Sequence, residues 1–265
     1  MGDWLLGLPV FWMGVVIQAI IYLFTAAVYL VITKLAVGER AKVFKAVSPG
    51  MLPPLSVVFA LLVGFLAAQV WNDGQAGNTA VNREASALRA IVLLAAAFPG
   101  ESEQRLRDLV SRHIQDVVSN DWPQMATGHA DLHLIPANLA EALRVSLALN
   151  PQTAGQTIAQ RELIGAIENA GDARRQRIIL SHSTINWVKW TALLAQAGLT
   201  LIAVAMVHSD NRATNRIILA IFATGVGAAV ILIAAHARPF SGEISVKPGI
   251  LLQVMPESTA SVGKP

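Results

Sequence analysis

Four long stretches of the sequence contain no charged side chain, and this feature constrains the fold more than any other. Asp, Glu, Lys and Arg are absent from residues 4–33, 46–72, 190–209 and 217–237. About 20 apolar residues in a helix that rises about 1.5 Å per residue cross a hydrocarbon core about 30 Å thick. After trimming of polar and proline-containing ends, the stretches predict membrane-spanning helices near 10–33, 53–71, 187–208 and 216–236.

The composition agrees with a membrane protein. Hydrophobic residues make up 54% of the chain and charged residues 14%, against roughly 25% charged residues in an ordinary soluble domain. A cleaved signal peptide explains the first stretch poorly, because Asp3 stands where a basic region is expected and the apolar run is too long. The chain has no cysteine, which excludes disulfides and thiolate chemistry. Basic residues are scattered among acids, so we expect no nucleic-acid partner.

A polar segment separates the second and third predicted spans. Its apolar residues recur at steps of three and four, which predicts helices over about 79–98, from an N-cap at Ser102 onwards, over 136–149 and over 153–186. The second of these carries one apolar stripe that includes His113. The fold class is therefore all-α, with a first hairpin (1–71), an inserted helical extramembrane domain (72–186), a second hairpin (187–237) and a tail (238–265). About the last ten residues have the composition of a disordered segment.

The second span is expected to continue into the inserted domain. Asn72, Asp73, Gly74 and Gly77 look like helix-stop signals, yet no proline occurs between Trp71 and Pro99. The apolar period also resumes a few residues later. We therefore predict one helix that leaves the bilayer at Trp71, loosens at the glycines and runs to about Phe98.

Two faces of the second span suggest different roles. Small residues at four-residue steps let helix backbones approach closely in lipid, and such pairs occur here and in the fourth span. The predicted helix-packing residues are Ala60, Gly64, Ala68, Ala223 and Gly227. The opposite face of the second span is apolar and then amide-bearing, as in a pore wall with a hydrophobic constriction. The predicted pore-lining residues are Val58, Leu62, Phe65, Leu66, Gln69, Asn72 and Asp73. The alternative is that the small stripe packs on the first span while the opposite face meets lipid.

Basic residues near the spans bear on orientation. Lys34, Arg40, Lys42 and Lys45 in the first loop favour a cytoplasmic loop, which places the inserted domain outside the cytoplasm. Arginines flanking the inserted domain nearly balance this bias, so the lean is slight.

Residues that could perform chemistry are few. His129, Asp131 and His133 form the only stretch that resembles a metal site, but Gly128 and the lack of a clear further ligand weaken it. No nucleotide-binding or hydrolase motif is present, and no ionisable side chain lies deep inside a span. We expect no cofactor and no enzyme activity. Glu84, beside Arg83, is expected to form a salt bridge or to pack between helices, and residues 174–177 form a basic patch.

Several motifs resemble the bacterial bestrophin-like family of four-span membrane proteins. They are "GFLAAQVW" with "VNREASALR" after it, "DWPQM", and "RPFSGEISVKP" past the last span, and the resemblance covers about residues 50–252. The motif residues to which it assigns structural roles are Trp71, Glu84, Trp122, Pro123, Pro239, Phe240 and Gly242. Since bestrophins are homopentameric ion channels lined by their second helix, it implies a homo-oligomer, a pentamer, in the bacterial inner membrane, with lipid and small inorganic ions as partners. A calcium clasp is not expected, because only Glu243 is available after the fourth span.

Two function classes remain open from the sequence, with a membrane enzyme built on the histidines as a third. The first is an oligomeric channel lined by the second span, whose ion sign is open because Asp73 favours cations and Arg83 anions. The second is a membrane-anchored interaction or scaffold protein whose inserted domain binds a partner and whose spans conduct nothing.

Overall fold

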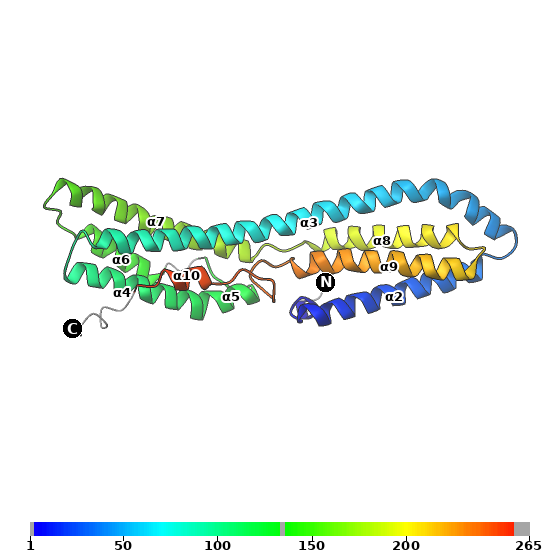
Figure 1. The fold of residues 1–265 in the computed structure, drawn as a ribbon, viewed down its shortest axis with the longest axis horizontal. Helices are drawn as coiled ribbons and strands as arrows, with labels where there is room; N and C mark the ends of the chain where they lie inside the picture. Colours follow the sequence, from blue (N-terminus) through cyan, green and yellow to red (C-terminus); the bar gives the residue numbers. More distant parts are fainter. Residues whose placement is uncertain (1–2, 133–135, 257–265) are drawn as a thin grey trace. The chain divides into compact units, whose positions relative to one another are not determined.

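The computed structural model describes residues 3–132 and 136–256, and every regular element among them is a helix (Figure 1). In chain order these elements are α1 (Asp3–Leu6), α2 (Val10–Leu35), α3 (Glu39–Ala95), α4 (Glu101–Asp116), the π-helix η1 (Val117–Asp121), α5 (Trp122–Thr127), α6 (Ala137–Leu147), α7 (Ala154–Ser181), α8 (Trp187–Val207), α9 (Arg212–Ala235) and α10 (Gly249–Gln253). The all-α prediction is confirmed for the described residues.

Four helices are long and apolar enough to cross a membrane by length and composition: α2, α3 from Pro49 onwards, α8 and α9. Helices α2 and α3 contain the first two predicted spans, and α8 and α9 cover the other two except for the last predicted residue of each. Helices α8 and α9 each start after an asparagine N-cap. Asn186 accepts a hydrogen bond from the Val188 amide at 2.6 Å, and Asn211 accepts from the Ala213 and Thr214 amides at 3.1 Å. These caps satisfy amide groups that a helix start leaves unpaired.

Helix α3 is a single helix of 57 residues that runs through the predicted stop signals. It ends at Ala95, three residues before the predicted end at Phe98. It begins at Glu39, however, and not near residue 53, so the predicted first loop is mostly helical. Pro49, Pro53 and Pro54 lie inside it. Prolines are tolerated in membrane helices because neighbouring groups can satisfy the freed carbonyls, and so they did not mark a helix start.

The chain divides into two compact units. Among the described residues, the first unit holds those up to Asn72, Thr184–Arg238 and Gly242–Ile244. The second holds Asp73–Ser183, Pro239–Ser241 and those from Ser245 onwards. In the first unit, α2 packs against α8 and α9, which run side by side (Figure 1). The buried stripe of α2, at steps of three, four and seven, is Met13, Ile17, Ile21, Thr25, Val28 and Ile32.

The second unit packs α4, α6 and α7 around the second half of α3. Its core includes Leu88 and Ile91 of α3, and the predicted apolar stripe of α4, His113 included, is buried. Pro136 caps α6 as predicted, whereas α4 begins at Glu101 after Gly100 rather than at an N-cap on Ser102. Gly100 has a φ of 102°, a conformation that glycine adopts readily, and with Gly100 as N-cap the helix starts two residues earlier than predicted. Helix α7 ends at Ser181, before the predicted 186.

Candidate functional site

The apolar half of α3 is far less buried than the other apolar helices. In its most apolar stretch 6% of the residues are buried, against 28% in α2, 50% in α8 and 39% in α9. The side that does pack within the chain carries Phe59, Leu62 and Leu66, which join the core of the first unit. Gln196 of α8 also donates to the Leu55 carbonyl at 2.8 Å. The remaining surface of α3 is free to meet lipid or another protein.

The structure does not bring the predicted pore residues to one face. Val58 (46% exposed), Phe65 (71%) and Asn72 are exposed, whereas Leu66 is buried in the core of the first unit and Leu62 packs against that core. Side chains four residues apart point about 40° apart around a helix, and this offset accumulates along a set of seven residues. The predicted set therefore extends from the exposed side of α3 onto the side that packs against the other helices.

Two of the three polar residues in the set, Gln69 and Asp73, have partners within their own units. Gln69 accepts a hydrogen bond from Lys189 Nζ at 2.6 Å in the first unit. Asp73 accepts one from Ser183 Oγ at 2.9 Å in the second. These hydrogen bonds fix the side chains of Gln69 and Asp73 where the apolar stretch of α3 gives way to its polar second half.

The small-residue stripes of α3 and α9 differ in environment. Ala60, Gly64 and Ala68 are exposed, and no described atom lies within 4 Å of a Cβ built at Gly64. The stripe therefore does not pack against the first span within the chain. Ala223 of α9 is buried instead, and a Cβ at Gly227 would collide with the side chain of Gln18 on α2. The stripe of α9 thus allows α2 and α9 to approach each other.

Aromatic residues lie near the ends of the apolar helices in the first unit. Trp71 is 60% exposed, and its ring centroid lies 6.5 Å from that of His236. Trp187 is exposed, whereas Trp190 is buried. Exposed tryptophans in such positions are typical of a membrane interface.

Glu84 of α3 lies fully buried in the second unit, where its carboxylate is held from two sides. Arg177 of α7 donates from Nε to Oε2 at 2.8 Å and from Nη2 to Oε1 at 3.2 Å. His113 Nε2 of α4 lies 3.2 Å from Oε1. Burial opposes the charge of Glu84, but the Arg177 charge and the hydrogen bonds from His113 and Arg177 outweigh it and lower the pKa of this carboxyl. The predicted salt bridge of Glu84 is confirmed, with Arg177 as its partner.

A second carboxylate, Asp121, completes a buried ionic network. Arg174 donates to both its oxygens, at 2.8 and 2.9 Å, and Arg177 Nη2 donates to Oδ2 at 3.3 Å. Asp121 is the last residue of the π-helix η1, a form of helix that often occurs at functional sites. Two arginines thus meet two carboxylates, of which Glu84 is fully buried and Asp121 is partly exposed.

The role of Arg177 was missed by reading residues 174–177 as a basic patch. A signal was present, however. Leu163, Ile167 and Ala170 mark the buried side of α7, and the same steps of three and four continue to Arg174 and Arg177. The two arginines lie on the core side of the helix, and Arg175 between them is exposed.

Trp122 joins this network to the segment after α9. Its ring lies 4.9 Å from the Arg177 guanidinium carbon and edge-on to Phe240 at 5.9 Å between centroids. Its Nε1 donates to the Val246 carbonyl at 3.3 Å. The two prolines of the family motifs are sequence neighbours of these rings. Pro123 follows Trp122 in the first turn of α5, and Pro239 precedes Phe240. Gly242 has a φ of 88°, a left-handed conformation that favours glycine.

Two of the three metal candidates, His129 and Asp131, lie among the described residues. His133 lies outside the described residues, and no group of three or more His, Cys, Asp or Glu side chains suited to a metal occurs within the described ranges.

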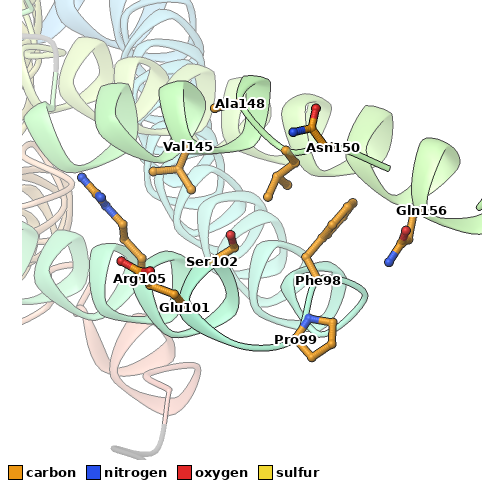
Figure 2. A pocket seen from close by; sticks show the side chains of 10 residues that line it. Phe98, Pro99, Glu101, Ser102, Arg105, Val145, Ala148, Asn150 and Gln156 are labelled. Carbon is orange, nitrogen blue, oxygen red and sulfur yellow. The ribbon is translucent and has the colours of Figure 1, made fainter. Parts of the chain in front are cut away.

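Two of the hollows among the described residues belong to the second unit. The smaller, about 460 Å³, lies where α3 leads into α4 and α6 leads towards α7 (Figure 2). Polar side chains at its wall are already engaged: Arg105 donates to Glu141 at 2.6 Å, and Gln156 donates to the Ala97 carbonyl at 3.0 Å. The larger, about 1260 Å³, is an open groove between α3 and α7, lined by Arg83 and Arg175 among many small and polar residues.

The chain matches one protein family over most of its length. The Bestrophin-like domain family covers residues 19–251. No curated protein and no solved structure gives a significant match. The family and the four apolar helices together support a membrane protein, and the family suggests a channel-like function rather than an enzyme. On the match to 19–251, the chain belongs to the bestrophin-like domain family.

Proposed function

We propose that the chain forms an oligomeric channel that passes small inorganic ions through a pore lined by the exposed side of α3. The observation that carries this proposal is the low burial of the apolar half of α3. Three apolar helices pack tightly together, and α3 contributes one side to them while its other side stays uncovered. A ring of copies would cover part of that side and leave part of it around an aqueous axis.

The exposed side of α3 has the composition of a narrow apolar pore. Phe65 and Val58 supply bulk, and Ala60, Gly64 and Ala68 supply close approach between neighbouring copies. Apolar constrictions gate ion flow by excluding water. The proposal therefore reduces the predicted pore set to Val58, Phe65 and Asn72, with Gln69 and Asp73 near its polar end, and moves Leu62 and Leu66 to the packed side.

The location of the two units follows from the same proposal. The first unit lies in the bacterial inner membrane, in contact with lipid, and the second unit, which corresponds to the predicted 72–186 domain, lies in water. The charges of the first loop favour an extracytoplasmic second unit. A reporter fused at Asn120 tests this side, since a reporter active only in the cytoplasm stays silent if the orientation is as proposed.

The channel is tested with purified protein in liposomes. We expect particles with a central symmetry axis, a pentameric ring if the family resemblance extends to subunit number, and ion flux that depends on the protein. Gly64→Leu places bulk on the exposed stripe and is expected to reduce both ring assembly and flux, whereas the chain keeps its helical content. A monomer without flux in the wild-type chain contradicts the proposal.

A scaffold is the second candidate, and the open groove of the second unit favours it. The groove between α3 and α7 offers about 1260 Å³ to a partner. If the chain is a scaffold, the joint substitution Arg83→Glu with Arg175→Glu removes partner recovery from solubilised membranes, and no ionic current accompanies the wild-type protein.

A further inference from the structure

Gly77 of α3 is a point of unusually close approach in the second unit. It is buried, and a Cβ built on it would lie 3.2 Å from Phe240 Cζ and 3.3 Å from Val246 Cγ2. Both partner side chains are themselves buried. Any residue other than glycine would push these two side chains away from the helix.

The segment that supplies Phe240 and Val246 is a short non-helical loop. The Val246 amide donates to the Pro239 carbonyl at 2.8 Å, which brings its two ends together. Trp122 contacts both ends, because its ring packs on Phe240 and its Nε1 donates to the Val246 carbonyl. The two apolar side chains therefore enter the second unit together, as one element.

Contacts from this loop return to α3 by a second route. Trp122 stacks on Arg177, and Arg177 binds Glu84 of α3. Gly77 and Glu84 are seven residues apart, which is about two helical turns, so they lie on nearly the same side of the helix. Helix α3 is thus held at two points two turns apart, directly by Phe240 and Val246 and indirectly through Trp122 and Arg177.

The first of these two points, Gly77, lies where the local sequence of α3 favours a helix least. Gly74 and Gly77 occur within four residues, and glycine disfavours a helix because it has the most backbone freedom to lose. Helix α3 is nevertheless continuous there. Contacts with Phe240 and Val246 supply the stabilisation that the local sequence lacks.

We propose that residues 239–246 form a strap that braces α3 at its glycines, and that release of the strap lets α3 bend there and closes the pore. Three residues, 236–238, separate the strap from Ala235, the last residue of α9. The strap regulates the channel proposed above, and its pore-closing role rests on that function. Its bracing of α3 is independent of conduction.

The strap is tested with Phe240→Ala in the full-length chain. We expect hydrogen exchange of the amides at 74–80 to rise on the order of tenfold and liposome ion flux to fall about fivefold, as local opening of the helix becomes easier. The matched control is Ile250→Ala, which removes an apolar side chain from an exposed position in the same unit and is expected to change neither quantity. Wild-type exchange and flux in Phe240→Ala overturn the proposal.

A reversible lock distinguishes bracing from general damage. Because the chain has no cysteine, Gly77→Cys and Val246→Cys can be added to Phe240→Ala as the only thiols. A Cβ built at Gly77 lies 3.3 Å from Val246 Cγ2, an atom attached to Cβ as a cysteine sulfur would be, and Phe240→Ala removes the other side chain that crowds this point. Oxidation is expected to restore slow exchange and flux, and reductant to remove both. A formed disulfide without rescue overturns the strap. If Phe240→Ala fails to fold, Phe240→Leu replaces it in the same comparison.

The exchange measurement separates failure of the strap from failure of the channel. If the wild-type protein passes no ions, the channel is wrong, and faster exchange in Phe240→Ala that the disulfide reverses still supports the brace. If flux is present but exchange and flux ignore Phe240 and the lock, the strap is wrong and the channel stands.

Discussion

The two halves of α3 differ in what their exposed and buried sides carry. In the first half, residues from 46 onwards carry no charged side chain and yet are largely exposed, whereas the second half is more polar and buries Glu84 completely. Apart from the side that packs on the other helices, the apolar side chains of this stretch therefore have no cover within the chain. Under the proposed function, lipid and other copies cover them. In the second half, the buried side is fixed by an ion pair whose geometry specifies one arrangement of α3, α4 and α7.

The largest effect is expected from breaking the buried ion pair. Arg177→Leu leaves Glu84 buried without its counter-charge, and loss of one partner of such a pair destabilises a protein by about 3–5 kcal/mol. Chemical unfolding in detergent, followed by tryptophan fluorescence, measures the change. Arg175→Leu, an exposed neighbour on the same helix, is the control, and an equal loss of stability in both variants contradicts the assigned role.

A smaller effect is expected from acid. The lowered pKa of Glu84 means that its ionised form stabilises the fold at pH values above its usual pKa of 4.5, and that this stabilisation is lost as the pH falls through the lowered value. The free energy of unfolding, measured from neutral to acidic pH, should therefore fall more steeply in the wild-type chain than in Glu84→Gln. Parallel curves for the two proteins mean that other groups cause the acid response.

The exposed half of α3 is probed with single cysteines in the cysteine-free chain. A methanethiosulfonate cation is expected to reduce ion flux through Phe65→Cys and Val58→Cys, because these positions are exposed and placed along the proposed pore. Leu66→Cys, adjacent but buried in the core, should not react. Modification of Leu66→Cys with loss of flux, and none at Phe65→Cys, reverses the assignment of the two sides.

The smallest effect is expected from the charges of the second half. Arg83 of α3 is exposed, whereas Glu84 is withdrawn into the ion pair and Asp73 is held by Ser183. Arg83→Glu is therefore expected to shift the reversal potential in a salt gradient by a few millivolts towards cation permeation. Arg112→Glu, exposed on α4, is the comparison, and an identical shift there shows that the response is only a change in net charge.

Much of the fold is a direct consequence of local sequence. The charge-free stretches are long enough for membrane helices, and chain length and apolarity are properties that each stretch carries by itself. The continuity of α3 past Trp71 followed from the absence of proline up to Pro99. The buried stripe of α4, His113 included, followed from its apolar period.

Other features depended on partners distant in sequence. Helix α3 starts at Glu39 although prolines predicted a later start, because a membrane helix can accommodate proline inside it. Helix α4 starts at Glu101 although Ser102 was the predicted N-cap, because the turn at Gly100 precedes it. Which side of α3 packs was decided by Phe59, Leu62 and Leu66 meeting the other helices. A helical period shows that two sides differ, but not which of them a neighbour covers.

The sequence by itself determined that the chain is helical, has four apolar segments and carries a helix through Gly77. Only the tertiary structure decided that Phe240 and Val246 close on that glycine and that Arg177 joins Glu84 to Asp121. These contacts join residues between 56 and 169 positions apart, with Arg177 and Glu84 separated by 93 positions. Their energies arise from burial and from charge pairing across helices, and neither quantity exists in any one segment before the helices pack.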